Sequence, residues 1–247
     1  MDEKTASTIK RVLLGLLFSL PILIVVTSLL MSADAVFEEL VGRIPNFIVQ
    51  LDFQEQLFRG LVILFFLFVF FGLFQRLTSN SDSIKSTRRE EKSNKISFDS
   101  VIVVTILLLL NSVYLLFTII QFTYFFGNSL QAGLTYAEYA RKGFFELIVV
   151  TLVNWTVLFS SLVMVKEKGI KVDRLLKVMY SLLIGFSAVL LASAYQRLSL
   201  YESAYGFTMD RVLAHAFMVF LLIIFAYTFI RVWMEKLSLV HFYLIAS

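Results

Sequence analysis

Long apolar stretches constrain this chain more than any other feature of its sequence. The plainest is the uninterrupted run LVILFFLFVFFGLF, which extends from Leu61 to Phe74. A helix that crosses a hydrocarbon core of about 30 Å needs about 20 largely apolar residues, and six stretches meet this requirement. With 59% apolar and 16% charged residues, the 247-residue chain cannot bury so much apolar surface in one water-soluble core. The sequence therefore excludes a soluble globular protein and a disordered chain, and it indicates a membrane protein.

The stretches predict an all-α fold, a polytopic membrane bundle of six transmembrane helices with a short outer amphipathic helix. The spans are expected at about 12–31, 57–74, 101–126, 143–165, 176–196 and 212–231. We expect the fourth helix to start early, near Leu134, so that its first two turns stand outside the bilayer. Because no repeat or second soluble domain is visible, residues 1–247 are expected to form a single membrane domain.

The distribution of basic residues predicts the orientation. If the chain crosses six times, sixteen of the 22 Lys and Arg residues fall on the side that carries both termini. Because basic residues accumulate in cytoplasmic loops, we expect both termini in the cytoplasm and the protein in the plasma membrane.

The basic loop 76–97 carries six of these residues and could be interpreted as a nucleic-acid patch. It has no interleaved aromatic residue except Phe98 at its edge, and Glu90 and Glu91 interrupt it. We therefore expect a cytoplasmic loop near anionic lipid and no nucleic-acid partner.

The outward segment 32–57 begins with a helical pattern. Its apolar residues follow the spacing of one helix face, and they are Ala33, Val36, Phe37, Leu40, Val41 and Ile44. Ser32 can cap this helix, Asp34 suits its first turn, and Pro45 stops it. The pattern predicts a short helix over 33–44 that lies on the outer surface and packs against the bundle.

Polar residues at hydrocarbon depth are the most informative about function in a membrane protein. The candidate polar cluster consists of Asn111, Gln121, Glu138, Arg141, Glu146, Asn154, Arg197, Tyr201, Arg211 and His215. Asn111 and Gln121 belong to one stripe on the third span, with Tyr114 and Thr118 between them. An unpaired carboxylate below the interface is costly, so Glu146 is expected to be protonated or to face Arg197 or Arg211. The cluster is interpreted either as an ion-pair network that fixes helix order or as a cavity for a ligand or proton.

The fifth span carries two further patterns. Its small residues, Ser181, Gly185, Ala188 and Ala192, predict a close approach of two helix backbones. Beyond the span the helix is expected to continue outward, which places Arg197 and Tyr201 four residues apart on one face. Arg211 and His215 have the same spacing at the start of the sixth span.

Three segments resemble a known family. SADAVFEEL (32–40), YAEYARKGFFEL (136–147) and RLSLYESAYGFTMDRVLAHAFM (197–218) are similar to the bacterial multi-pass membrane family called domain of unknown function 4173, which is related to the 4153 type. The resemblance implies a polytopic bacterial membrane protein and brings no established activity. Members of such families are usually longer, and HFYLIAS at the C-terminus looks like the beginning of another span. The chain is therefore expected to be either a fragment or a shortened member.

The residue types and motifs in the sequence limit the classes of function that the protein can have. It holds two His and no Cys, and none of the common hydrolase, metalloprotease or nucleotide-binding motifs occurs, so we expect no catalytic residues, metal or cofactor. The favoured hypothesis is a non-catalytic membrane protein that binds, senses or scaffolds at its outer face. Its partners would be the lipid bilayer and a membrane protein or small ligand. The alternative is a transporter or permease for a small solute, with an outward-facing polar cavity around Glu146.

Overall fold

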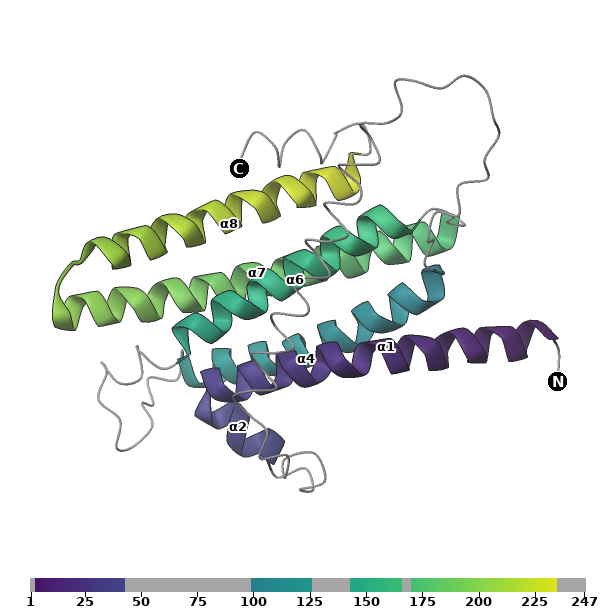
Figure 1. The fold of residues 1–247 in the computed structure, drawn as a ribbon, viewed down its shortest axis with the longest axis horizontal. Helices are drawn as coiled ribbons and strands as arrows, with labels where there is room; N and C mark the ends of the chain where they lie inside the picture. The colour runs from purple at the N-terminus through teal and green to yellow at the C-terminus, as the bar shows by residue number, and fades with distance from the viewer. Residues whose placement is uncertain (1–2, 43–98, 126–142, 166–169, 235–247) are drawn as a thin grey trace, which may run out of the picture. The chain divides into compact units, whose positions relative to one another are not determined.

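The computed structural model describes residues 3–42, 99–125, 143–165 and 170–234, and these residues form helices joined by short connections, with no strand among them. The helices are α1 (Glu3–Ala33), α2 (Ala35–Gly42), α4 (Ser100–Phe125), α6 (Phe144–Met164), α7 (Ile170–Tyr205) and α8 (Met209–Trp233). They belong to one compact unit, whereas the second unit, residues 42–96, lies almost wholly outside the described residues (Figure 1).

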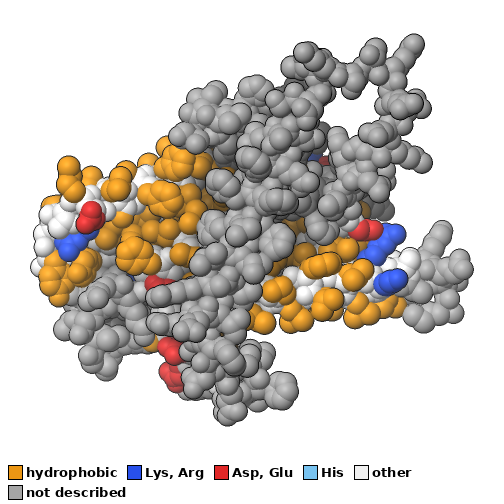
Figure 2. All heavy atoms as spheres, in the orientation of Figure 1, with side chains coloured by type: hydrophobic (Ala, Val, Ile, Leu, Met, Phe, Trp, Pro, Cys, Tyr) orange, Lys and Arg blue, Asp and Glu red, His pale blue; other side chains and the backbone are white. Residues whose placement is uncertain are grey.

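Five of these helices are long and apolar enough to cross a membrane, namely α1, α4, α6, α7 and α8. They confirm five of the six predicted spans. The remaining predicted span, 57–74, lies outside the described residues. Hydrophobic side chains cover much of the visible surface of the described helices in Figure 2. Leu13 and Leu17 on α1 are each 60% exposed, as expected for side chains that face lipid rather than a protein core.

Contacts at both ends of α1 and α4 show the relative direction of these two helices. Arg11 of α1 forms an ion pair with Asp99, just before α4, with 2.8 Å between Nη1 and Oδ2. At the other end of the same two helices, Gln121 Nε2 lies 3.4 Å from Oδ2 of Asp34. Helices α1 and α4 therefore run parallel. We call the end that contains Asp34 the Asp34 end of the bundle, and the opposite end the Arg11 end.

Helix α7 is the centre of the packing, because it contacts α4, α6 and α8, while α1 packs on α4 and α6. Helix α8 packs chiefly on α7 and returns antiparallel to it, so the two form a hairpin whose turn lies at the left of Figure 1. We call α7, α8 and the turn 206–208 the α7–α8 hairpin. Trp233 Nε1 donates to Oγ of Ser181 at 3.2 Å, which joins the two helices at the Arg11 end.

The helix that contains the fourth span begins later than expected. Helix α6 starts at Phe144, and Gly143 before it has φ +88° in the left-handed region, which a continuing right-handed helix cannot adopt. The expectation of one helix from Leu134 through this point is therefore wrong. At 21 residues, α6 is about 31 Å long, which matches the hydrocarbon thickness without an outer extension.

The small-residue stripe of α7 does not mediate a close helix approach among the described helices. A Cβ atom added at Gly185 would meet no described atom within 4 Å, and Gly185 and Ala192 are exposed. The close approach occurs instead between α1 and α4. There, a Cβ on Gly15 would lie 2.8 Å from Cβ of Thr105 and 3.2 Å from the carbonyl oxygen of Ile102.

Candidate functional site

The carboxylate of Asp34 lies where α1 gives way to α2, and it caps the second helix. Its Oδ1 accepts hydrogen bonds from the backbone N–H of Val36 at 3.0 Å and of Phe37 at 3.2 Å. Asp is one of the preferred residues at this position because its side chain satisfies helix N–H groups that have no partner within the helix.

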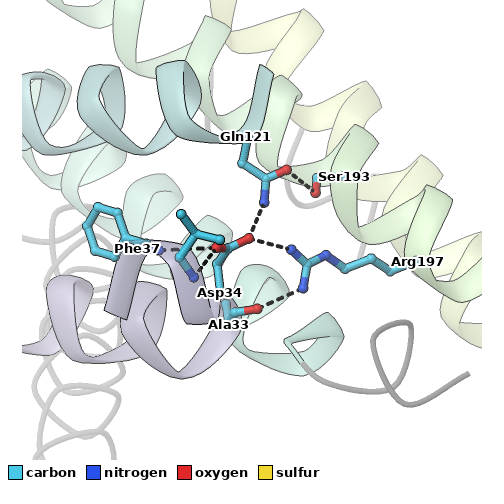
Figure 3. A network of polar contacts seen from close by, with 7 residues as sticks. Ala33, Asp34, Phe37, Gln121, Ser193 and Arg197 are labelled. Atoms are coloured by element: carbon cyan, nitrogen blue, oxygen red, sulfur yellow. Dashed lines mark hydrogen bonds and ion pairs between the residues drawn. The ribbon is translucent and has the colours of Figure 1, made fainter. Parts of the chain in front are cut away.

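The second carboxylate oxygen of Asp34 receives a buried arginine. Arg197 Nη2 lies 3.3 Å from Oδ2 of Asp34, and Nη1 donates to the carbonyl oxygen of Ala33 at 2.7 Å (Figure 3). The Arg197 residue is 0% exposed. Because Ala33 is the last residue of α1, the guanidinium lies at the negative end of that helix dipole, and the Asp34 carboxylate lies at the positive end of α2. Both charges are therefore favourably placed with respect to their helices.

One side-chain amide and one hydroxyl group complete this arrangement. Gln121 on α4 directs its Nε2 toward Oδ2 of Asp34, and its Oε1 accepts a hydrogen bond from Oγ of Ser193 on α7 at 3.0 Å. The carboxylate of Asp34 thus has four donors, two for each oxygen, which is the number that a carboxylate can accept. We call the group formed by Ala33, Asp34, Gln121, Ser193 and Arg197 the Asp34 cluster.

Gly143 allows the cluster to close. A Cβ at this position would lie 2.7 Å from Cα of Ala33 and 2.7 Å from Nη1 of Arg197. No side chain fits between the start of α6 and these atoms, so only glycine permits the approach. Since Gly143 also adopts a positive φ, both its backbone conformation and its surroundings require glycine.

Glu146, the expected centre of the polar cluster, does not pair with an arginine in the described part of the chain. It is half-buried on the first turn of α6, and its Oε1 accepts a hydrogen bond from Oγ of Ser32 at 3.4 Å. Arg197 pairs with Asp34 instead, and the guanidinium of Arg211 lies 4.5 Å from the ring centroid of Tyr201 and donates to the carbonyl of Gly206. Of the two alternatives expected for Glu146, the pairing with Arg197 or Arg211 is therefore wrong, and protonation stays a prediction.

A second polar group lies deeper in the bundle. Tyr114 on α4 donates its hydroxyl hydrogen to Oδ1 of Asn154 on α6, and Asn154 Nδ2 donates to Oγ of Ser187 on α7 at 2.9 Å. Asn111, one turn from Tyr114, donates from Nδ2 to the carbonyl oxygen of Met179 at 3.1 Å. The expected polar stripe of α4 therefore does face the interior, but its members contact different helices.

The third polar group belongs to the α7–α8 hairpin beyond the Asp34 cluster. His215 on α8 lies between Ser199 and Glu202 of α7, and the ring of Tyr201 packs at a tilt against that of Tyr205, with 4.8 Å between centroids. The helical spacing of Arg197 with Tyr201, and of Arg211 with His215, is confirmed because each pair lies within one continuous helix. The structure thus separates the predicted cluster into three groups. Glu138 and Arg141 lie outside the described residues.

Four of these residues were not predicted as site residues, namely Asp34, Gly143, Ser187 and Ser193. Asp34 was assigned to the first turn of the outer helix, with Ser32 as the cap. This is wrong, because Ser32 lies within α1 and Asp34 itself caps α2. Ser187 and Ser193 carry no signal in the sequence, because single serines in an apolar helix are common and only the packing shows which of them meets a partner.

The fold and these polar groups define a class: a helical multi-pass membrane protein whose polar side chains gather between helices at one end and near mid-span. The family described as Domain of unknown function (DUF4153) matches residues 1–247, the whole chain, so the chain belongs to this family. The resemblance to the 4173 type is thereby corrected to the related 4153 type. No curated protein and no solved structure matches the chain.

Proposed function

We propose that this chain is a non-catalytic integral membrane protein that binds, senses or scaffolds at the Asp34 end of its bundle. The observation that supports this proposal is the saturation of the Asp34 carboxylate. Arg197 is fully buried with donors directed at Ala33 and Asp34, and the Asp34 carboxylate has a donor for each lone pair. A site that binds and releases a solute needs polar groups that can exchange partners, whereas this cluster holds α1, α2, α4 and α7 together.

The surface for binding in this proposal is the tip of the α7–α8 hairpin. From Arg197 to Tyr205, α7 continues for about 12 Å beyond the Asp34 cluster. At this tip Phe207 is 80% exposed and Met209 is 86% exposed. Aromatic residues and Met are enriched at protein interfaces, which favours a contact with a partner.

The proposed topology has six crossings, with both termini in the cytoplasm and the Asp34 end outside. Its support is the parallel direction of α1 and α4, since two consecutive spans with the same direction require the intervening chain to cross back. Between them, only 57–74 is apolar enough and long enough to do so. The positive-inside distribution supports a cytoplasmic Arg11 end, and the plasma membrane is part of the same proposal.

The second candidate function is transport of a small solute. In its favour, Oδ1 of Asn111 is buried near the middle of α4 and has no hydrogen-bond partner among the described residues. A passing solute or water could use such an acceptor. In this alternative, an aqueous path would extend from Glu146 past Gln121 to Asn111.

Because the chain has no native Cys, reaction with a small charged thiol reagent separates the two functions. Single cysteines at Glu146, Gln121 and Asn111 would be tested in the full chain in lipid vesicles. We expect the half-buried position 146 to react, and the buried positions 121 and 111 to react at least tenfold more slowly. Fast reaction at all three positions would favour transport.

A photo-crosslinking residue at Phe207 tests the binding surface, with Leu17 on the lipid-exposed side of α1 as the matched control. A defined protein or ligand adduct at position 207 and only lipid adducts at position 17 would support the proposal. The same lipid adducts at both positions would contradict it.

A further inference from the structure

His215 has an unusual set of neighbours for a residue near the start of a spanning helix. Its Nε2 lies 3.3 Å from Oγ of Ser199, and its Nδ1 lies 3.2 Å from the carbonyl oxygen of Arg211 and 3.4 Å from Oε1 of Glu202. The ring of Tyr195 packs at right angles to the imidazole, with 4.4 Å between centroids. Ser199, Glu202 and Tyr195 all belong to α7, so His215 joins the two helices of the α7–α8 hairpin.

The groups around His215 are placed as hydrogen-bond acceptors for both ring nitrogens. Oγ of Ser199 donates its hydrogen to the carbonyl oxygen of Tyr195 at 3.0 Å, so it is available to accept a hydrogen bond from Nε2. On the other side, Nδ1 faces a carbonyl and a carboxylate, which are acceptors. An imidazolium donates from both nitrogens, from Nε2 to Oγ of Ser199 and from Nδ1 to the carbonyl oxygen of Arg211, and its positive charge faces Oε1 of Glu202. A neutral imidazole has one N–H and can match these neighbours only if Ser199 turns away from Tyr195.

The carboxylate of Glu202 depends on the proton bound to His215, because that proton gives the ring its positive charge. Its Oε1 is buried and has no hydrogen-bond partner within the described residues, so the ring of His215 supplies its nearest counter-charge. The other titratable and charged groups on these two helices are otherwise engaged or distant from the ring. The guanidinium of Arg211 lies over Tyr201 and bonds the carbonyl of Gly206, and Asp210 is exposed. A buried carboxylate that loses its cation carries a large desolvation cost.

We propose that His215 is a proton-binding site that latches α8 to the outer part of α7. With the proton bound, the ion pair to Glu202 and the hydrogen bond to Ser199 hold the tip of the hairpin closed. When the proton leaves, the carboxylate of Glu202 faces a neutral ring, and the two helices separate at the tip. Helix α8 can respond because it packs chiefly on α7, and the contact of Trp233 with Ser181 keeps the opposite end joined. The latch rests on these contacts and is independent of the proposed function.

Distance measurements between paired spin labels test the latch in the full chain in lipid nanodiscs. One pair of cysteines replaces the exposed residues Gln196 and Ala216 near the tip, and a reference pair replaces Leu182 and Phe229 near the Arg11 end. Between about pH 5.5 and about pH 8.5, histidine titrates whereas ordinary carboxylates do not. We expect the tip pair to shift to longer and broader distances at the higher pH while the reference pair stays unchanged. Identical tip distributions at both pH values would overturn the latch.

Variants assign the response to the proton on His215. H215Q retains hydrogen-bonding capacity without a titrating charge, and E202Q removes the carboxylate that needs the cation. In both variants we expect the tip distances to become independent of pH. The chain's other histidine provides the matched control, because H241Q should keep the full response. A pH response that persists in H215Q and E202Q, or that disappears in H241Q, would overturn the proposal.

Discussion

Among single residues, Asp34 and Gly143 explain how the ends of five helices meet, namely α1, α2, α4, α6 and α7. Asp34 is both the cap of α2 and the partner of Arg197, so one carboxylate serves a helix end and a cation at the same time. Gly143 removes the side chain that would otherwise separate α6 from α1. A change at either residue therefore affects contacts between helices that are more than 100 residues apart in the chain.

Replacement of Gly143 by alanine and replacement of Gly185 by alanine should have different effects on stability. Gly143→Ala places a methyl group against Cα of Ala33 and Nη1 of Arg197, and it forces alanine into the left-handed region, which alone costs about 1–2 kcal/mol. Gly185→Ala adds a methyl group in open space on a helix, where alanine is favoured over glycine by about 0.5–1 kcal/mol. Thermal unfolding in detergent should show a lower midpoint for the first variant and an unchanged or higher midpoint for the second. Equal losses in both would contradict the close approach at Gly143.

At this level the sequence predicted which residues are polar and at what depth, but not their partners. Depth follows from position along a span, so the burial of Asn111, Gln121 and Asn154 could be foreseen. The rotation of each helix about its axis depends on packing, and it decides whether Arg197 meets Glu146 or Asp34. The role of Asp34 was also hard to predict, because Asp occurs both at helix caps and on exposed helix faces.

Among the helices, α2 shows how a short amphipathic element is held on the bundle. Phe37 is 1% exposed, and its ring packs edge-to-face on Phe117 of α4 with 5.3 Å between centroids. Glu38 on the next position is exposed. The expectation that the apolar face of this helix packs against the bundle is confirmed over Ala35–Gly42, and the predicted stop at Pro45 lies outside the described residues.

Two substitutions on adjacent residues of α2 test this packing. Phe37→Asp buries a charge among apolar neighbours and should cost several kcal/mol, whereas Glu38→Lys changes an exposed charge and should stay within about 0.5 kcal/mol. The readout is the free energy of unfolding in mixed micelles. If the two variants lose stability equally, α2 does not pack through Phe37.

The spans themselves were predictable because each depends on the length and composition of a continuous stretch. All five described spans lie where the sequence placed them, and the continuation of α7 beyond its span to Tyr205 was also foreseen. The start of α6 was not, because YAEYARKG has good helix formers up to Gly143 and the required left-handed turn results from the approach of Ala33 and Arg197.

For the molecule as a whole, the topology can be tested by labelling single introduced cysteines, because the native chain has none. Single cysteines at Ser81 and Asn128 should fall on opposite sides of the membrane if the chain crosses six times with both termini inside. An impermeant thiol reagent added to intact cells should label position 128 and not position 81. Labelling of position 81 from outside would reverse the orientation.

The buried pair of Asp34 and Arg197 is the contact on which the structure of this end depends, and a double-mutant cycle measures it directly. Asp34→Asn keeps a good helix cap while it removes the charge, and Arg197→Met keeps much of the length of the side chain. Each single change should cost about 3–5 kcal/mol because it strands a buried charge, and the double change should cost less than their sum by about 0.5–3 kcal/mol. The parallel cycle of Glu146→Gln with Arg197→Met should be additive within about 0.5 kcal/mol. Additivity of Asp34 with Arg197, together with coupling of Glu146 to Arg197, would contradict the arrangement described for this end of the bundle.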